Sequence, residues 1–383
     1  MRKYRALLIS CILWFIFLCI LHYLSARPLW LDENFIFGNI KTLKTTQLLG
    51  PLKNSQAFPR IYLIIIKIFS QRFDYSVFSL RLFPLISMIC AFFIWAKIYK
   101  EAFFNKWHFL MVLFSFAGSY SLSYYAAELK PYSLDLLVVG IFCLYLIDQE
   151  RLVDRASWKL FTIVTLMLPI TLFLSYASFF VFWIVIYNFL LLVKKNRKVL
   201  PLLIGYTAIS LSFVIFVYFH DLRHGLATPA LFNYWNDYFL CSDSFYCFIK
   251  SFGEGLRKLS VWWFGNSAFF RRVASPFIPI FVLSMVIYGI GAIKKCKLKL
   301  LTIDAIGLVI FLELIILGLL KKYPFTGERI TLFFAPFVFY FIVKGINSFR
   351  SNKPLYVGFN IFYIVFFLAC NINSFLAHLK AYR

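Results

Sequence analysis

The sequence predicts an all-α protein that crosses a membrane many times as a single membrane domain spanning residues 1–383. Of its 383 residues, 62% are hydrophobic and only 15% are charged. A soluble domain averages about 45–50% apolar and about 25% charged residues. The mean hydropathy of +0.80 points the same way. A soluble globule of this composition would lack the polar residues needed to cover its surface, so that class is excluded.

Apolar runs long enough to cross about 30 Å of hydrocarbon recur along the chain. The first follows a short basic N-terminus and is longer than the core of a signal peptide, so we expect an uncleaved first span. The runs within 159–193 are the least distinct, because only Leu174-Ser175-Tyr176 divides them. About eleven spans are expected in all, near residues 6–24, 80–98, 107–123, 131–148, 159–175, 176–193, 199–219, 276–293, 301–320, 329–345 and 354–372.

The formal net charge is +24, because 40 Lys and Arg stand against 16 Asp and Glu. The basic residues cluster in short loops between the apolar runs, which is the pattern of cytoplasmic loops. We therefore expect a multi-pass protein of the cell inner (plasma) membrane with a cytoplasmic N-terminus. The bilayer, including its anionic lipids, is the expected partner of this charge, and no nucleic acid is expected. The basic loops lie near 97–106, 151–159, 194–198, 294–299 and 344–353.

Two large segments, 25–79 and 220–275, fall on the opposite, extracytoplasmic side. Each contains apolar stretches too short to span, such as 261–264, which we expect to form helices lying in the membrane interface. Cys241 and Cys247 are both in the second segment, where an oxidising compartment leaves a disulfide and free thiols equally open. The sequence has no CxxC pair and no Cys/His cluster at zinc spacing, so no metal site is predicted.

Charged residues outside the basic loops are the candidates for chemistry, because polar groups are costly near lipid. Asp32 and Glu33 stand beside Trp30, just after the first span. A carboxylate in this position is suited to accept a proton from a hydroxyl group. A solvated loop or a helix N-cap would explain the same acids.

Three further clusters fall on the same extracytoplasmic side. Glu128 and Lys130 lie in a very short turn between two predicted spans, where a capped turn with an ion pair would also account for them. Arginine suits phosphate oxygens because its guanidinium donates in a planar fork. Arg60, Arg81 and Arg329 all lie at the membrane boundary, where snorkelling is the alternative explanation.

In order along the chain, these segments resemble the motifs of the GT-C class of membrane glycosyltransferases, which use polyprenyl-phosphate sugars. The nearest resemblance is to the bacterial branch of the protein mannosyltransferase and aminoarabinose transferase families. The similarity runs from the N-terminus to about residue 345. The matching segments are Leu29–Glu33, Phe58–Tyr62, Leu80–Pro84, Tyr124–Leu134 and Glu328–Pro336.

The resemblance implies a GT-C-like fold and an inverting transfer of one sugar to an acceptor hydroxyl outside the cytoplasm. The acceptor would be an envelope glycan, a lipid or a protein. Two departures stand out: Lys130 replaces an arginine of the family, and a histidine of the family is missing before Arg60. The implied roles are Asp32 as base, Glu33 as acceptor-orienting group or substitute base, Lys130, Arg329, Arg60 and Arg81 at the donor phosphate, and Glu128, Tyr132 and Tyr62 in support.

Two other classes of function stay open. A lipid-linked sugar flippase or other transporter would use the same basic groups, with the intramembrane Glu313 as a coupling group. The sequence shows none of the internal symmetry common in transporters, and a non-catalytic scaffold would not need the clustered acids. Segment 220–275 is expected to contact the acceptor, with an interfacial anchor as the alternative for its aromatic stretch Phe232–Tyr238. No cofactor is predicted; a requirement for a divalent cation stays open, because the acids of the first loop would suit one.

Overall fold

The computed structural model describes residues 2–155, 158–223, 229–265, 267–295 and 302–382. All regular secondary structure in these ranges is helical. Eight of the helical segments described are long and apolar enough to cross a membrane, which agrees with a multi-pass α-helical membrane protein. They are Lys3–Leu24, Val77–Ala102, Tyr132–Gln149, Tyr176–Lys195, Arg197–Leu222, Phe277–Lys294, Arg329–Ser351 and Lys353–Ala381.

Three of the predicted spans form shorter helices. α5 (Lys106–Gly118) has 13 residues and α16 (Ile303–Leu319) has 17. The expected span at 159–175 consists of α8 (Trp158–Met167) followed by the 3₁₀ helix η3 (Leu168–Phe173). A helix rises about 1.5 Å per residue, so the shortest of these cross the hydrocarbon only together with their neighbours. The figure of about eleven spans stays a prediction.

The long helices pack around a buried centre. α4 (Val77–Ala102) runs along α7 (Tyr132–Arg155), and Trp95 joins the two by donating its indole N–H to the backbone oxygen of Leu136 at 3.1 Å. α17 (Ala335–Ser348) lies inside the bundle, with every residue of its first turns buried. The outer spans are α1 (Arg2–Leu24), α9 (Phe182–Lys195), α10 (Leu200–Val217), α15 (Phe277–Lys295) and α18 (Lys353–Tyr382).

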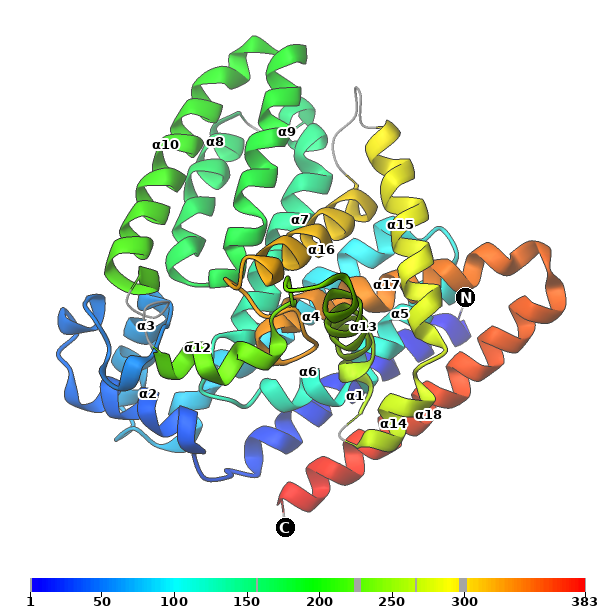
Figure 1. The fold of residues 1–383 in the computed structure, drawn as a ribbon, viewed down its shortest axis with the longest axis horizontal. Helices are drawn as coiled ribbons and strands as arrows, with labels where there is room; N and C mark the ends of the chain where they lie inside the picture. The colour runs from blue at the N-terminus through cyan, green and yellow to red at the C-terminus, as the bar shows by residue number, and fades with distance from the viewer. Residues whose placement is uncertain (1, 156–157, 224–228, 266, 296–301, 383) are drawn as a thin grey trace.

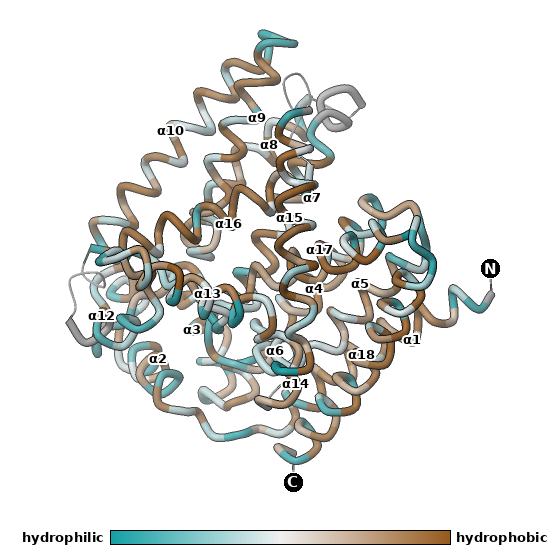
Figure 2. Tube along the Cα trace, turned by 45° about the vertical axis from the view of Figure 1, so that its right-hand side comes forward, coloured by the Kyte–Doolittle hydropathy of each residue, from teal (hydrophilic) through white to brown (hydrophobic). Residues whose placement is uncertain are grey.

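Segments predicted to share one side of the membrane come together in space. Asp32 and Arg329 form an ion pair at 2.6 Å at one end of the bundle, whereas Lys97 and Asp148 pair at 3.3 Å where α4 and α7 approach the basic loops. Helices α2, α3 and α12 gather at one end of α8–α10 (Figure 1). Polar residues concentrate there and at the opposite helix ends, while apolar residues cover the lengths between them (Figure 2). This distribution is that of helices that cross a membrane.

The two large segments predicted to be extracytoplasmic contain several helices joined by short non-helical stretches. One part of the interfacial prediction is wrong: Val261, Trp263 and Phe264 are fully buried in the protein, so this stretch contributes to the core and does not lie at a membrane surface. The helices of the two segments are α2 (Leu31–Thr42), η1 (Gln47–Leu49), η2 (Lys53–Ser55), α3 (Arg60–Gln71), α12 (Pro229–Trp235), η7 (Asn236–Tyr238), α13 (Phe245–Val261), η8 (Trp262–Phe264) and α14 (Ala268–Val273). The remaining short helices are α6 (Tyr120–Tyr125), η4 (Tyr176–Phe180), η5 (Arg197–Val199), the π-helical turn η6 (Tyr218–Leu222), η9 (Arg329–Phe334) and η10 (Phe349–Ser351).

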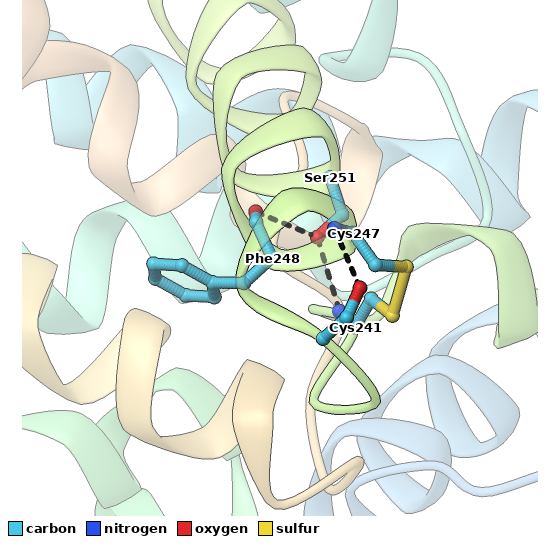
Figure 3. Close-up of a disulfide and its surroundings, with 5 residues drawn as sticks. Cys241, Cys247, Phe248 and Ser251 are labelled. Atoms are coloured by element: carbon cyan, nitrogen blue, oxygen red, sulfur yellow. Dashed lines mark hydrogen bonds between the residues drawn. A yellow bond between two sulfur atoms is a disulfide. The ribbon is translucent and has the colours of Figure 1, made fainter.

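Cys241 and Cys247 form a disulfide at the start of α13 (Figure 3). The backbone N–H of Cys241 donates to the hydroxyl of Ser251 at 3.0 Å, and that hydroxyl donates to the backbone oxygen of Phe248 at 3.1 Å. The preceding residue, Leu240, donates its backbone N–H to Gly318 at 3.2 Å. The cross-linked turn thereby fastens the second extracytoplasmic segment to the end of α16.

Candidate functional site

A cavity of about 480 Å³ lies where the segments predicted to be extracytoplasmic meet. Its walls come from parts of the chain far apart in sequence: the start of α2, the residues before α3, the α6–α7 turn, η4, α12 and the loop between α16 and η9. Three of the four charged clusters identified in the sequence contribute a charged side chain to it, namely Asp32, Lys130 and Arg329. The volume suits a small polar group such as a sugar ring with a phosphate.

Asp32 and Arg329 form the charged wall of this cavity. The Asp32 side chain is 27% exposed, and its Oδ2 accepts a hydrogen bond from Arg329 Nη2 at 2.6 Å. The guanidinium of Arg329 also lies over the ring of Trp30, 4.6 Å from its centroid. A carboxylate held by one arginine and still open to the cavity lies within reach of a bound hydroxyl group.

Lys130 completes the charged wall. Its ammonium lies 5.3 Å from the centroid of the Phe58 ring and donates to the side-chain oxygen of Gln56 at 3.4 Å. Burial lowers the pKa of Lys130 to about 8, with the nearby charge of Asp32 acting in the opposite sense. Among the residues described, Lys130 has no ion-pair partner within contact distance, so its charge is available to an anionic ligand.

Glu33, the neighbour of Asp32 in sequence, lies away from the cavity and is fully buried. As the third residue of α2, it accepts the backbone N–H of Trp30 at 3.3 Å, which closes the helix start as a capping box does. It also accepts from Arg81 Nε at 3.1 Å and Nη2 at 2.7 Å, from Arg27 Nη1 at 3.2 Å and from the backbone N–H of Leu129 at 2.7 Å. Glu33 is thus the centre of a buried network that joins α2, α4 and the α6–α7 turn.

Arg81 and Glu128 belong to this buried layer. Arg81 is 1% exposed, and besides Glu33 it donates to the backbone oxygen of Arg27 at 2.7 Å. Glu128 is fully buried, and its Oε1 accepts the indole N–H of Trp30 at 2.8 Å. Burial raises the pKa of Glu128, and the adjacent charge of Glu33 adds to the effect. Glu33 and Glu128 thus fix the position of Trp30, whose ring lies against the guanidinium of Arg329.

Arg60 does not line the cavity; it forms a buried ion pair with Asp221. Asp221 also accepts the backbone N–H of Phe58 at 3.2 Å. Tyr62 donates its hydroxyl to the backbone oxygen of Lys130 at 2.8 Å. Together these contacts tie the segment before α3 to the end of α10 and to the α6–α7 turn, so they shape the cavity wall without facing it.

Tyr132, expected in a supporting role, lines the cavity. Four further lining residues were not assigned to a site from the sequence: Asp135, Tyr176 and the adjacent lysines Lys321 and Lys322. Each had a signal in the sequence that could have identified it. Asp135 is an acid in the first turn of a predicted span, and Tyr176 lies at a break in an apolar run. Lys321 and Lys322 are basic residues in a loop on the side predicted to carry few of them. The aromatic stretch of the segment expected to contact the acceptor supplies Phe232, Tyr234 and Trp235 to the lining of the cavity.

The acids of the first loop do not converge on a metal position, because Asp32 faces the cavity and Glu33 faces its arginines. Within the described part of the chain, no group of three or more His, Cys, Asp or Glu side chains is arranged to hold a metal ion. No family model, curated protein or solved structure matches this chain.

Proposed function

We propose that this protein is a membrane glycosyltransferase that moves a sugar from a polyprenyl-phosphate donor to an acceptor hydroxyl on the extracytoplasmic face. The acceptor is an envelope glycan, a lipid or a protein. The observation that carries the proposal is the grouping of a solvent-accessible carboxylate, Asp32, with the cations Lys130 and Arg329 in one cavity at the membrane boundary. These groups are what a displacement at a sugar–phosphate bond requires.

In the proposed reaction, Asp32 accepts the proton of the acceptor hydroxyl while its oxygen attacks the anomeric carbon. The bond between that carbon and the phosphate oxygen breaks, and its electron pair stays on the phosphate. Lys130 and Arg329 stabilise the developing charge because they are fixed in place before reaction. A single displacement inverts the anomeric centre. Prenyl phosphate leaves within the bilayer, in which the chain crosses about eleven times in the predicted topology.

The geometry favours some of the expected roles over others. Asp32 is supported as base because it faces the cavity, whereas Glu33 is supported as a positioning residue that sets the start of α2. Lys130 and Arg329 are supported as phosphate ligands. Arg60 and Arg81 already neutralise Asp221 and Glu33, so we assign them to the scaffold around the cavity.

The experiment compares glycolipids and surface glycans by mass spectrometry in cells that carry wild-type protein, no protein, Asp32→Asn or Asp243→Asn. Asp243 is an exposed acid of the second extracytoplasmic segment and serves as the matched control. We expect the deletion and Asp32→Asn to lose one sugar from an envelope product and to accumulate its prenyl-phosphate precursor, while Asp243→Asn matches wild type. Loss of one general base typically costs 10²–10⁴-fold in rate, so residual transfer should be about 1% or less. Wild-type glycans in Asp32→Asn would remove Asp32 from the mechanism.

The alternative function is a lipid-linked sugar flippase or other transporter, for which Glu313 would be the coupling acid. Glu313 accepts the indole N–H of Trp183, and its Oε2 is buried without a hydrogen-bond partner among the described residues. It does not line the cavity. Glu313→Gln should leave a transferase active and should stop a proton-coupled transporter, so the same glycan profile separates the two functions.

A further inference from the structure

The lining of the cavity includes a buried carboxylate that the proposed reaction does not use. Asp135 is 7% exposed and lines the cavity from the first turn of α7. Within the described part of the chain, no lysine, arginine or histidine forms an ion pair with it. A buried acid without a cation is costly unless hydrogen bonds satisfy its oxygens. Its presence at a cavity wall is therefore an observation that needs an explanation.

The protein supplies only part of the hydrogen bonding that this carboxylate can accept. Ser175 donates its hydroxyl to Asp135 Oδ1 at 2.6 Å, and the backbone N–H of Ala177 is a second donor. An ionised carboxylate offers about four acceptor positions. Space for further donors lies on the cavity side, because Asp135, Tyr176 and Ala177 all line the cavity.

A break in the helical backbone presents these donors. η3 ends before Ser175, which has an extended conformation (φ −153°, ψ 126°), and η4 begins directly after it. Non-helical backbone at membrane depth is tolerated where it lines a cavity or is enclosed by protein. The break thus sits at a place where a ligand, and not lipid, would meet the exposed backbone.

Tyr176 adds a second unexplained polar group on the same wall. Its hydroxyl oxygen is buried and has no hydrogen-bond partner among the described residues. Buried polar groups nearly always have a partner, so an unpaired hydroxyl on a residue that lines the cavity indicates a polar ligand that can reach it. An acceptor carboxylate beside a phenol that both donates and accepts matches neighbouring hydroxyl groups on a sugar ring.

We propose that Asp135 and Tyr176 form the subsite that binds the hydroxyl groups of the transferred sugar, in the same cavity as the Lys130 and Arg329 side chains that hold its phosphate. This inference rests on the proposed transferase function and makes these two residues determinants of sugar specificity. Lys130 and Arg329 then recognise the anion common to all such donors, while the Asp135–Tyr176 wall distinguishes one sugar from another.

The test uses the full-length protein in detergent, with the prenyl-phosphate precursor that accumulates in the deletion strain as donor. The variants are Asp135→Asn, which keeps an oxygen to accept from Ser175, and Tyr176→Phe, which removes only the hydroxyl. Tyr246→Phe is the matched control, because Tyr246 is 78% exposed on α13. Farnesyl phosphate, which carries the phosphate and no sugar, is measured as a competing ligand.

We expect the donor KM to rise about 5-fold or more in both Tyr176→Phe and Asp135→Asn, because each variant loses a hydrogen bond to the sugar. Inhibition by farnesyl phosphate should stay at the wild-type value in both variants and in Tyr246→Phe. Unchanged donor KM values, or farnesyl phosphate inhibition weakened in parallel with donor binding, would overturn the sugar subsite. Either result leaves the transferase function standing if Asp32→Asn is inactive. Failure of the wild-type protein to turn over the precursor would instead overturn the proposed function and this inference with it.

Discussion

Replacing Glu33 with glutamine should lower the stability of the folded protein, whereas the same kind of change at the neighbouring Asp32 should abolish activity and leave stability nearly unchanged. The structure gives the two acids opposite surroundings. Glu33 is fully buried between Arg81 and Arg27, and Asp32 is 27% exposed beside Arg329. The pair of substitutions therefore tests the assignment of a structural role to one acid and a catalytic role to the other.

The magnitude follows from the charge that each substitution leaves behind. Glu33→Gln removes the negative charge that neutralises Arg81, whose side chain is 1% exposed, and turns an amide N–H₂ toward arginine donors. Breaking a buried ion pair by removing one partner costs about 3–5 kcal/mol. Asp32→Asn disturbs a partly solvated pair, which contributes about 0–1 kcal/mol. The two variants should differ by about 3 kcal/mol in the free energy of unfolding.

The assay is unfolding of the purified protein in mixed micelles, followed by helical circular dichroism as the denaturing detergent fraction rises. Glu254→Gln is the matched control, because Glu254 is a half-exposed acid that pairs with Lys258 on the surface of α13 at 3.2 Å. We expect Glu254→Gln and Asp32→Asn to unfold close to wild type and Glu33→Gln to unfold much earlier. A Glu33→Gln protein of wild-type stability that has lost transfer activity would refute the reasoning and make Glu33 the base.

Two further predictions concern Lys130 in the cavity wall and Gly327 in the loop between α16 and η9. Because burial lowers the pKa of Lys130 to about 8, its charge is lost as the pH rises through that value. Competition by farnesyl phosphate should therefore weaken above about pH 8 in wild type. It should stay level in Lys130→Arg, because a guanidinium keeps its charge over this range. The same shift makes folding more favourable as the pH rises from about 8 toward the ordinary lysine value. Gly327→Ala should lower thermal stability, because the added Cβ would lie 2.0 Å from the backbone oxygen of Lys258, whereas Gly253→Ala, with open space around it, should match or slightly exceed wild type. Equal thermal stability of the two alanine variants would contradict the close approach of this loop to α13.

The broad architecture was predictable because it depends on composition and on charge in short segments. Long apolar runs must form helices in a bilayer, since lipid offers no partner for backbone polar groups. The basic loops then assign each segment to a side, which is why Asp32, Lys130 and Arg329 were all expected on the same side before any contact was known. The disulfide at Cys241 was open from the sequence, and three spans proved shorter than expected.

The roles of individual charges depended on the tertiary structure. Asp32 and Glu33 are adjacent, but successive residues of a helix point about 100° apart, so one faces the cavity and the other faces the arginines. Composition and spacing cannot choose between them, because the choice depends on how α2 is rotated against α4.

Arg60 and Arg81 illustrate the same limit. Their partners, Asp221 and Glu33, lie 161 and 48 residues away in the chain. Local sequence predicts a side of the membrane for each charge, through hydropathy and loop charge. Only the packing of distant helices decided which charges neutralise one another in the interior and which remain facing the cavity, because ion pairing depends on distance in space and not along the chain.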